Sequence, residues 1–143
     1  MIVENFFEKV FYPNLKNNIE TNSNYKTLVT KAMTQESKKF PIVPVRLLDV
    51  TNQYNNLSYG EETYTFSIEI NIYSIDNEYF SKRTICNEIT QTIVNYLKEN
   101  YRLTIKTKID ALNVDSNIQR NIIIASGKLD TKYGLDKLVI YPR

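Results

Sequence analysis

Apolar and polar side chains alternate most regularly in the stretch EETYTFSIEINIYSID, residues 61–76. Large apolar residues occupy every second position from Tyr64 to Ile72, and polar residues occupy the positions between them. Successive side chains of a strand point to opposite faces of a sheet. The spacing therefore predicts a strand with one face on the core and one polar face toward water or a partner.

Other stretches also have the pattern of strands. Residues 103–110 alternate between apolar and polar positions, and residues 117–130 predict a further strand. Residues 39–50 predict a strand that contains Pro41 and Pro44. Because proline cannot donate a ladder hydrogen bond, these residues belong at the start of a strand or on a sheet edge. Residues 137–143 are a candidate for a last strand.

Helical spacing occurs in two places. Apolar residues recur every three or four positions over residues 2–12, and Pro13 disfavours helical geometry at the residue before it, so we expect a short helix that ends there. Residues 81–101 predict the clearest helix, with Ser81 as its N-cap. Residues 15–39 stay open, because their pattern fits either a helix or a strand.

The order of these elements predicts the fold class. The polar stretch TNQYNNLSYGEE, residues 51–62, predicts a hairpin loop that is mobile in the free protein and ordered by a partner. A helix, two strands, a helix and two or three further strands then favour an α+β fold, in which a mostly antiparallel sheet carries its helices on one face. The length suits a single domain over residues 1–143.

Composition excludes several classes of function. Lysine and arginine exceed the acidic residues by 18 to 16, and no long run of like charge occurs, so nucleic acid is not an obvious partner. Only three glycines are present, so no phosphate-binding loop of repeated glycines can form. The first residues lack the features of a signal peptide, and no apolar run approaches a membrane span. We expect a protein without a membrane segment, made in the cytoplasm.

Candidate chemistry is sparse. Histidine is absent, so the commonest general base and metal ligand is missing. Cys86 is the only cysteine and has no histidine to lower its pKa, which favours a structural thiol. We expect a protein that is not an enzyme and needs no cofactor.

Two groups of acidic residues are weak candidates for metal sites. The stretch DALNVDSN, residues 110–117, lacks the glycine and glutamate that an EF-hand loop requires, so a polar turn between strands explains it better. Asp49, Glu69 and Asp76 resemble a nuclease-like set of carboxylates, but no lysine follows Glu69 in the customary place. Solvent-facing strand positions account for them, and we expect no metal site.

Several tyrosines and charged residues are candidates for contact with another subunit or a partner protein. Eleven tyrosines are present, and tyrosine combines an apolar ring with a polar tip, which suits protein interfaces. Lys82 and Arg83 begin a predicted helix, where cations oppose the macrodipole, so an external contact is one explanation of them. The candidate subunit or partner interface consists of Tyr54, Tyr59, Glu61, Glu62, Tyr73, Lys82, Arg83, Asp115 and Arg120.

Arg120 is a special case among these residues. It shares a strand face with isoleucines that we expect to form a buried row, namely Ile118, Ile122 and Ile124. A cation in such a row either reaches solvent by its long stem or pairs with a carboxylate, because an unpaired buried charge is costly. Asp49 and Asp115 are the candidate partners.

Four stretches carry a resemblance to a known family: KFPIVPVRLLDV, ETYTFSIEINIYSIDN, SKRTICNEITQTIVNYL and NVDSNIQRNIIIASGKLD. Together they resemble the tail terminator and related neck proteins of long-tailed bacteriophages. Such families often have an Asn-x-Asp-x-x-Ile-x-Arg element, which here is formed by Asn113, Asp115, Ile118 and Arg120. The resemblance covers roughly residues 38–130. The N-terminal third is not covered, and ENYRLTIK stands where the family often has a glycine and an aromatic residue.

The resemblance implies a structural virion protein of the phage neck, assembled in the host cytoplasm. Its subunits would form a homohexameric ring that caps the head-proximal end of the tail tube, ends tube polymerisation and joins the tail to the head-side connector. Its partners would be further copies of itself, the tube protein, the connector and, in a contractile tail, the sheath; DNA would only pass through the ring. The alternatives are a head-tail connector or head-completion protein and, more remotely, a metal-dependent nuclease of similar fold.

Overall fold

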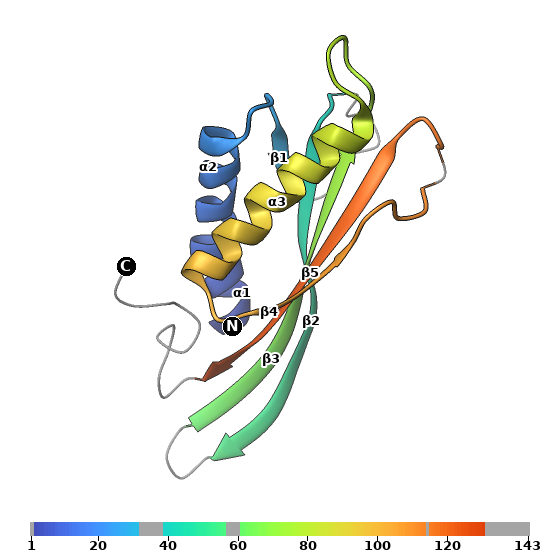
Figure 1. Ribbon diagram of the computed structural model, residues 1–143. Coiled ribbons are helices and arrows are strands. Elements are labelled where there is room, and N and C mark those ends of the chain that lie inside the picture. The colour runs from blue at the N-terminus through green and yellow to red at the C-terminus, as the bar shows by residue number, and fades with distance from the viewer. Residues whose placement is uncertain (1, 32–38, 57–60, 114, 131–143) are drawn as a thin grey trace.

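The computed structural model of the protein describes residues 2–31, 39–56, 61–113 and 115–130, with the backbone alone for residues 53–56 and 61–62 (Figure 1). One five-stranded sheet runs through it, with two helical segments packed against the sheet. None of the helices described is long and apolar enough to cross a membrane.

The N-terminal helical segment is longer than the sequence pattern predicts. It consists of α1 (Ile2–Phe6), a π-helical turn η1 (Phe7–Phe11) and α2 (Tyr12–Asn22). The expected end at Pro13 is wrong, because Tyr12 keeps helical dihedral angles and its N–H bonds to the carbonyl of Phe7. Pro13 lies in the first turn of α2, where a helix tolerates proline, and the π-helical turn η1 directly precedes this helix.

The strands lie in the order β1-β2-β3-β5-β4. Only the pairing of β1 with β2 is parallel, so the mostly antiparallel α+β fold is confirmed. The strand bounds are β1 (Leu28–Thr30), β2 (Ile42–Asn56), β3 (Glu61–Ser74), β4 (Thr104–Lys108) and β5 (Gln119–Asp130).

The prolines of β2 occupy positions that strands tolerate. Pro41 directly precedes β2, and Pro44 lies opposite Thr30, where the short strand β1 ends. No described strand pairs with this side of β2 beyond Pro44. This placement agrees with the prediction that proline stays near a strand start or on an edge.

Both helical segments lie on one face of the sheet, as Figure 1 shows. The second is α3 (Lys82–Asn100), which begins at Ser81 as predicted, because the Ser81 hydroxyl accepts the N–H of Thr84 at 3.2 Å. No described helix or strand covers the opposite face of the sheet, which we call the open face.

The core lies between the sheet and the helices. Ile68, Ile70 and Ile72 of β3 are fully buried there, as the alternation in residues 61–76 predicts. They form a single cluster with apolar side chains of β5, α3 and the N-terminal helices, including Ile123, Ile89, Ile93, Leu97, Phe6 and Phe11.

The prediction of which face of β5 is buried is wrong, because the buried positions are shifted by one residue from those expected. Asn121, Ile123 and Ala125 are buried, whereas Ile122 and Ile124 lie with Arg120 on the open face and are partly exposed. Three consecutive isoleucines place apolar side chains on both faces of a strand, so alternation alone does not identify the core side.

The predicted hairpin loop over residues 51–62 is also largely wrong. β2 runs on to Asn56, β3 begins at Glu61, and Asn55 lies opposite Glu62 in the ladder. Backbone hydrogen bonds hold this segment as strand despite its polar side chains. Figure 1 shows the paired ends of β2 and β3 projecting beyond the helices as an arm. The tip at residues 57–60 and the candidate strand at residues 137–143 lie outside the described residues.

Candidate functional site

The candidate interface residues separate toward the two ends of the sheet. Tyr54, Glu61 and Glu62 belong to the arm, whereas Tyr73 lies near the other end of β3. At about 3.3 Å per residue, Glu61 and Tyr73 are roughly 40 Å apart along the strand. The sequence therefore marks two distant regions rather than one site. Tyr59 lies outside the described residues.

The remaining candidates gather near Tyr73. Lys82 and Arg83 begin α3, Asp115 lies in the connection between β4 and β5, and Arg120 stands opposite Tyr73 in the ladder. Two connections lie here, residues 75–81 and the described residues 109–113 and 115–118 of the connection between β4 and β5, and we call this region the loop end (Figure 1).

Apolar side chains are exposed mainly at the loop end. Every large hydrophobic residue that is exposed in the described structure belongs to one of its two connections: Ile75, Tyr79, Phe80, Ile109 and Leu112. Tyr79 is 80% exposed and Leu112 is 87% exposed. Single exposed hydrophobic residues are ordinary, but their concentration at one end of a molecule is typical of a contact surface.

Hydrogen bonds tie the connection between β4 and β5 to the start of α3 and to β5. The Nζ of Lys82 donates to the carbonyl of Ser116 at 2.9 Å, and Arg83 forms an ion pair with Asp110. The backbone N–H of Asp110 donates to the buried side chain of Asn121 at 3.2 Å. Lys82 and Arg83 thus have partners within the chain, and these bonds hold the connection between β4 and β5 against the start of α3.

Arg120 lies on the open face and is held by three contacts. Its Nε donates to Oδ1 of Asn71 at 3.0 Å, one terminal nitrogen donates to the carbonyl of Leu112 at 3.0 Å, and the guanidinium lies 5.7 Å from the centre of the Tyr73 ring. These contacts fix the orientation of a cation that sequence reasoning left either solvated or paired with a carboxylate.

The prediction that Arg120 pairs with Asp49 or Asp115 is wrong. Asp49 stands opposite Ser67, well along the sheet from the pair formed by Tyr73 and Arg120. The carboxylate of Asp115 accepts the N–H of Asn117 at 2.9 Å and so closes its own turn. Strand register, which one sequence does not reveal, determines which side chains Arg120 can reach.

Arg46 is a second cation of this region, linked to Arg120 through Glu69 and Asn71. The Nε of Arg46 donates to Oε1 of Glu69 at 2.9 Å, and Nδ2 of Asn71 donates to the same oxygen at 2.8 Å. Burial acts to raise the pKa of Glu69, but hydrogen bonds from Arg46 and Asn71 and the nearby positive charges outweigh it, so this pKa lies below its ordinary value. Glu69 is therefore an anchoring carboxylate for Arg46.

These side chains line a hollow of about 370 Å³ on the open face, which we call the arginine pocket. It is lined by Lys31, Pro44, Arg46, Glu69, Asn71, Tyr73 and Arg120. Three cations and one carboxylate make its lining positive, although Lys31 also pairs with Glu8. Fixed guanidinium groups beside an aromatic ring suit the binding of a carboxylate or another anion.

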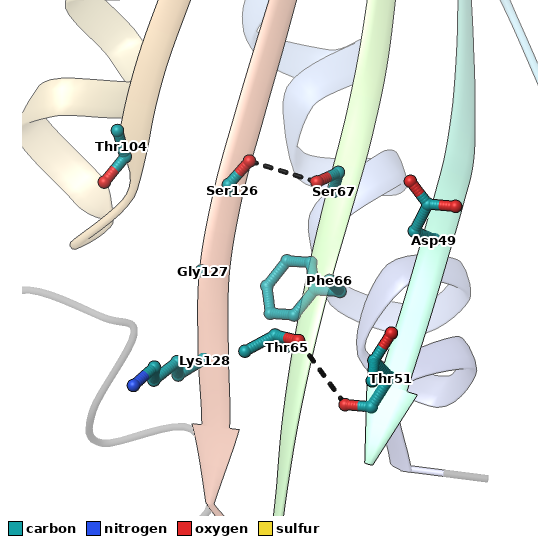
Figure 2. A pocket seen from close by; sticks show the side chains of 9 residues that line it. All are labelled: Asp49, Thr51, Thr65, Phe66, Ser67, Thr104, Ser126, Gly127 and Lys128. Atoms are coloured by element: carbon teal, nitrogen blue, oxygen red, sulfur yellow. Dashed lines mark hydrogen bonds between the residues drawn. The ribbon is translucent and has the colours of Figure 1, made fainter. Parts of the chain in front are cut away.

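A second hollow of about 270 Å³ lies further along the same face, toward the arm (Figure 2). Hydroxyl groups dominate its lining, which also includes Asp49 and Lys128. The hydroxyls of Ser67 and Ser126 lie 3.0 Å apart and bond to each other, and Thr65 bonds to the carbonyl of Thr51 at 3.5 Å. This surface offers hydroxyl groups, together with one acidic and one basic side chain, to a partner.

The groups considered for chemistry have structural contacts. Burial raises the pKa of the Cys86 thiol to about 12, and its Sγ lies 3.5 Å from the carbonyl oxygen of Gln119. The structural interpretation of this thiol is thus supported by its surroundings. Asp76 accepts the N–H of Lys82 at 2.7 Å, at the start of α3. Among the residues that the structure describes, no three His, Cys, Asp or Glu side chains are grouped so as to hold a metal ion.

Sequence reasoning missed Arg46, Asn71 and Leu112 as members of the site. Asn71 carried a usable signal, because it belongs to the polar row of β3 that the alternation assigns to the outer face. Leu112 takes part through its backbone carbonyl, which leaves no trace in residue identity. No protein-family model matches this chain, and no curated protein matches it either.

Proposed function

We propose that the protein is a tail terminator, a structural virion protein that forms a ring on the head-proximal end of a phage tail tube. The ring ends tube polymerisation and joins the tail to the head-side connector. The role is structural and involves no catalytic step.

The observation that carries the proposal is the difference between the two ends of the sheet. The loop end presents exposed hydrophobic side chains beside a positively charged pocket, whereas the arm is a two-stranded projection that extends past the helices (Figure 1). A ring made of identical subunits requires two different surfaces on each subunit that fit each other. It also requires further surface for the tube below and the connector above. A subunit with unlike ends and an open sheet face offers these surfaces.

The experiment measures assembly and tube length together. The purified protein is analysed by native mass spectrometry and negative-stain microscopy, and is then added to polymerising tail tube protein of the same phage. We expect closed rings, on their own or on tube ends, and tubes that stop growing when the protein is present.

Other outcomes decide between the alternatives. Rings that bind isolated heads or portal complexes but leave tube length unchanged would establish a connector instead. Magnesium-dependent cleavage of DNA that disappears in both Asp49→Ala and Glu69→Ala would establish a nuclease. A protein that neither assembles nor affects tubes contradicts the terminator role.

A further inference from the structure

The connection at residues 75–81 presents an acid and an aromatic ring together. Oδ1 of Asn77 accepts the N–H groups of Tyr79 and Phe80 at 2.8 and 2.7 Å, and the N–H of Asn77 donates to the carbonyl of Phe80 at 3.0 Å. Glu78 and Tyr79 are the two central residues of this closed turn, and both are exposed. The turn thus holds a carboxylate and a tyrosine ring out in solvent.

Glu78 is the acidic residue of this turn, and its carboxylate is available for contact with another molecule. Asp76 already accepts the N–H of Lys82, whereas Glu78 makes no hydrogen bond or ion pair with the described part of the chain. Tyr79, its neighbour, is 80% exposed. An exposed carboxylate next to an exposed tyrosine is a small, stiff group for contact with a positively charged surface.

The arginine pocket has the complementary chemistry. Arg46 bonds to Glu69 through Nε alone, so its two terminal nitrogens are not used in that bond, and its side chain is 62% exposed. Such a fork binds a carboxylate with two parallel hydrogen bonds. Tyr73 and Pro44 supply the apolar part of the pocket lining, although both are largely buried and Tyr73 is only 8% exposed.

We propose that the turn at residues 77–80 of one copy docks in the arginine pocket of the next copy, with Glu78 binding Arg46 and Tyr79 packing beside Tyr73 and Pro44. The occupant is a second copy of this chain, because the same chain carries both the positive pocket and the exposed acid. The inference rests on the proposed ring, and it specifies the contact between neighbouring subunits.

The two surfaces suit a head-to-tail contact. The pocket lies on the open face and the turn projects from the connection after β3, so each copy can offer its turn to one neighbour and its pocket to another. A contact between two different patches repeats from copy to copy and closes into a ring when the rotation allows.

Charge reversal tests the contact. Glu78→Lys gives a copy with a positive turn and a positive pocket, and Arg46→Glu gives a copy with a negative turn and a pocket of reduced charge. Each variant alone should associate about tenfold to a hundredfold more weakly than the natural chain, because residues 78 and 46 then carry charges of the same sign at the contact. An equal mixture should recover assembly, because the two variants can alternate around a ring with opposite charges at every contact. Sedimentation velocity measures all three samples.

Matched variants make the result decisive. Lys106→Glu reverses an exposed cation of β4 on the same face, outside the pocket, and should assemble like the natural chain. Melting curves verify that each variant folds, and Arg46→Ala replaces Arg46→Glu if the latter unfolds; it should weaken assembly in the same direction.

The outcomes separate this contact from the proposed function. If the natural chain forms rings and the folded single variants form them equally well, the proposed contact between Glu78 and Arg46 is wrong, but the proposed ring is not contradicted. If Glu78→Lys and Arg46→Glu both fold and their mixture does not recover assembly, the contact is also overturned. If the mixture of the two variants forms dimers but no larger species, the head-to-tail arrangement is wrong. If the natural chain forms no ring at any concentration, with or without tube protein, the proposed function fails as well.

Discussion

The two faces of β3 and β5 are built by the same strands but stabilised in different ways. On the covered face, Ile70 and Ile123 stand opposite each other in the ladder and are fully buried beneath the helices. One position along each strand, Glu69 and Ile124 stand opposite each other on the open face, where both are only partly buried. The covered face is held by apolar packing, and the open face near the loop end by directional hydrogen bonds.

This difference suggests that the covered face mainly determines the stability of the fold and the open face mainly determines contacts with partners. Apolar burial is large in free energy but is not directional. Bonds such as those of Arg120 to Asn71 and Leu112 contribute less to folding because water competes for them, but they fix where each charged group points. We therefore expect substitutions on the covered face to affect unfolding and substitutions on the open face to affect assembly.

The largest effect should come from adjacent isoleucines of β5. Ile123→Ala removes a fully buried side chain from the core and should lower the free energy of unfolding by about 2–5 kcal/mol. Ile124→Ala changes the same residue type on the open face, and its loss should be about 1 kcal/mol or less. Urea unfolding at one temperature measures both. Equal losses would mean that the open face is covered in the protein as studied and that the comparison is wrong.

The same comparison shows what the sequence can predict. The period-two spacing from Tyr64 to Ile72 identified the core side of β3 because every apolar residue there has the same parity. Ser81 and the helical spacing after it identified α3 because capping and periodicity are local properties. The three isoleucines of β5 have both parities, so their assignment required the register with β3.

The parts that could not be predicted depend on contacts far apart in the sequence. The helical segment continues through Pro13 after a π-helical turn that apolar spacing does not reveal, and the strand at residues 51–56 depends on a ladder with β3. The arginine pocket combines residues of β2, β3 and β5, which only the sheet order brings together. Residue types suggested Arg120 as a contact residue, but its partners followed from register and from a backbone carbonyl.

A smaller effect on stability should follow from Arg120→Ala. The change removes two hydrogen bonds and the contact with the Tyr73 ring, and the loss of unfolding free energy should be about 1–2 kcal/mol. Assembly should weaken as well, because Arg120 lines the arginine pocket. Lys106→Ala and Lys108→Ala alter exposed residues of β4 and should change stability by no more than about 0.5 kcal/mol.

Ultracentrifugation together with a melting curve for each variant compares the three positions. The expected result is that only Arg120→Ala both melts earlier and sediments as a smaller species at the same concentration. If all three variants assemble and melt alike, the contacts of Arg120 on the open face have no consequence for folding or for assembly.

The smallest effect should be the pH dependence contributed by Glu69. Its pKa in the folded protein lies below the ordinary value, because hydrogen bonds from Arg46 and Asn71 favour the carboxylate. A carboxyl group whose pKa is lowered by folding adds stability above its unfolded pKa, and that stability is lost as the pH falls through the folded pKa. The Arg46 side chain is 62% exposed, so solvent screens the pair and the contribution should be roughly 0.2–1 kcal/mol.

Comparison with Glu69→Gln isolates this contribution. Glutamine has nearly the same shape but does not ionise, so the difference in unfolding free energy between the natural chain and the variant should be larger at pH 7 than at pH 3. Titration of the other acidic residues affects both proteins and cancels in the difference. Urea unfolding at the two pH values provides the measurement. A difference that stays constant, or grows toward pH 3, would show that the Glu69 carboxylate is not preferentially stabilised by folding, and Glu69 would then not be the anchor of Arg46 on the open face.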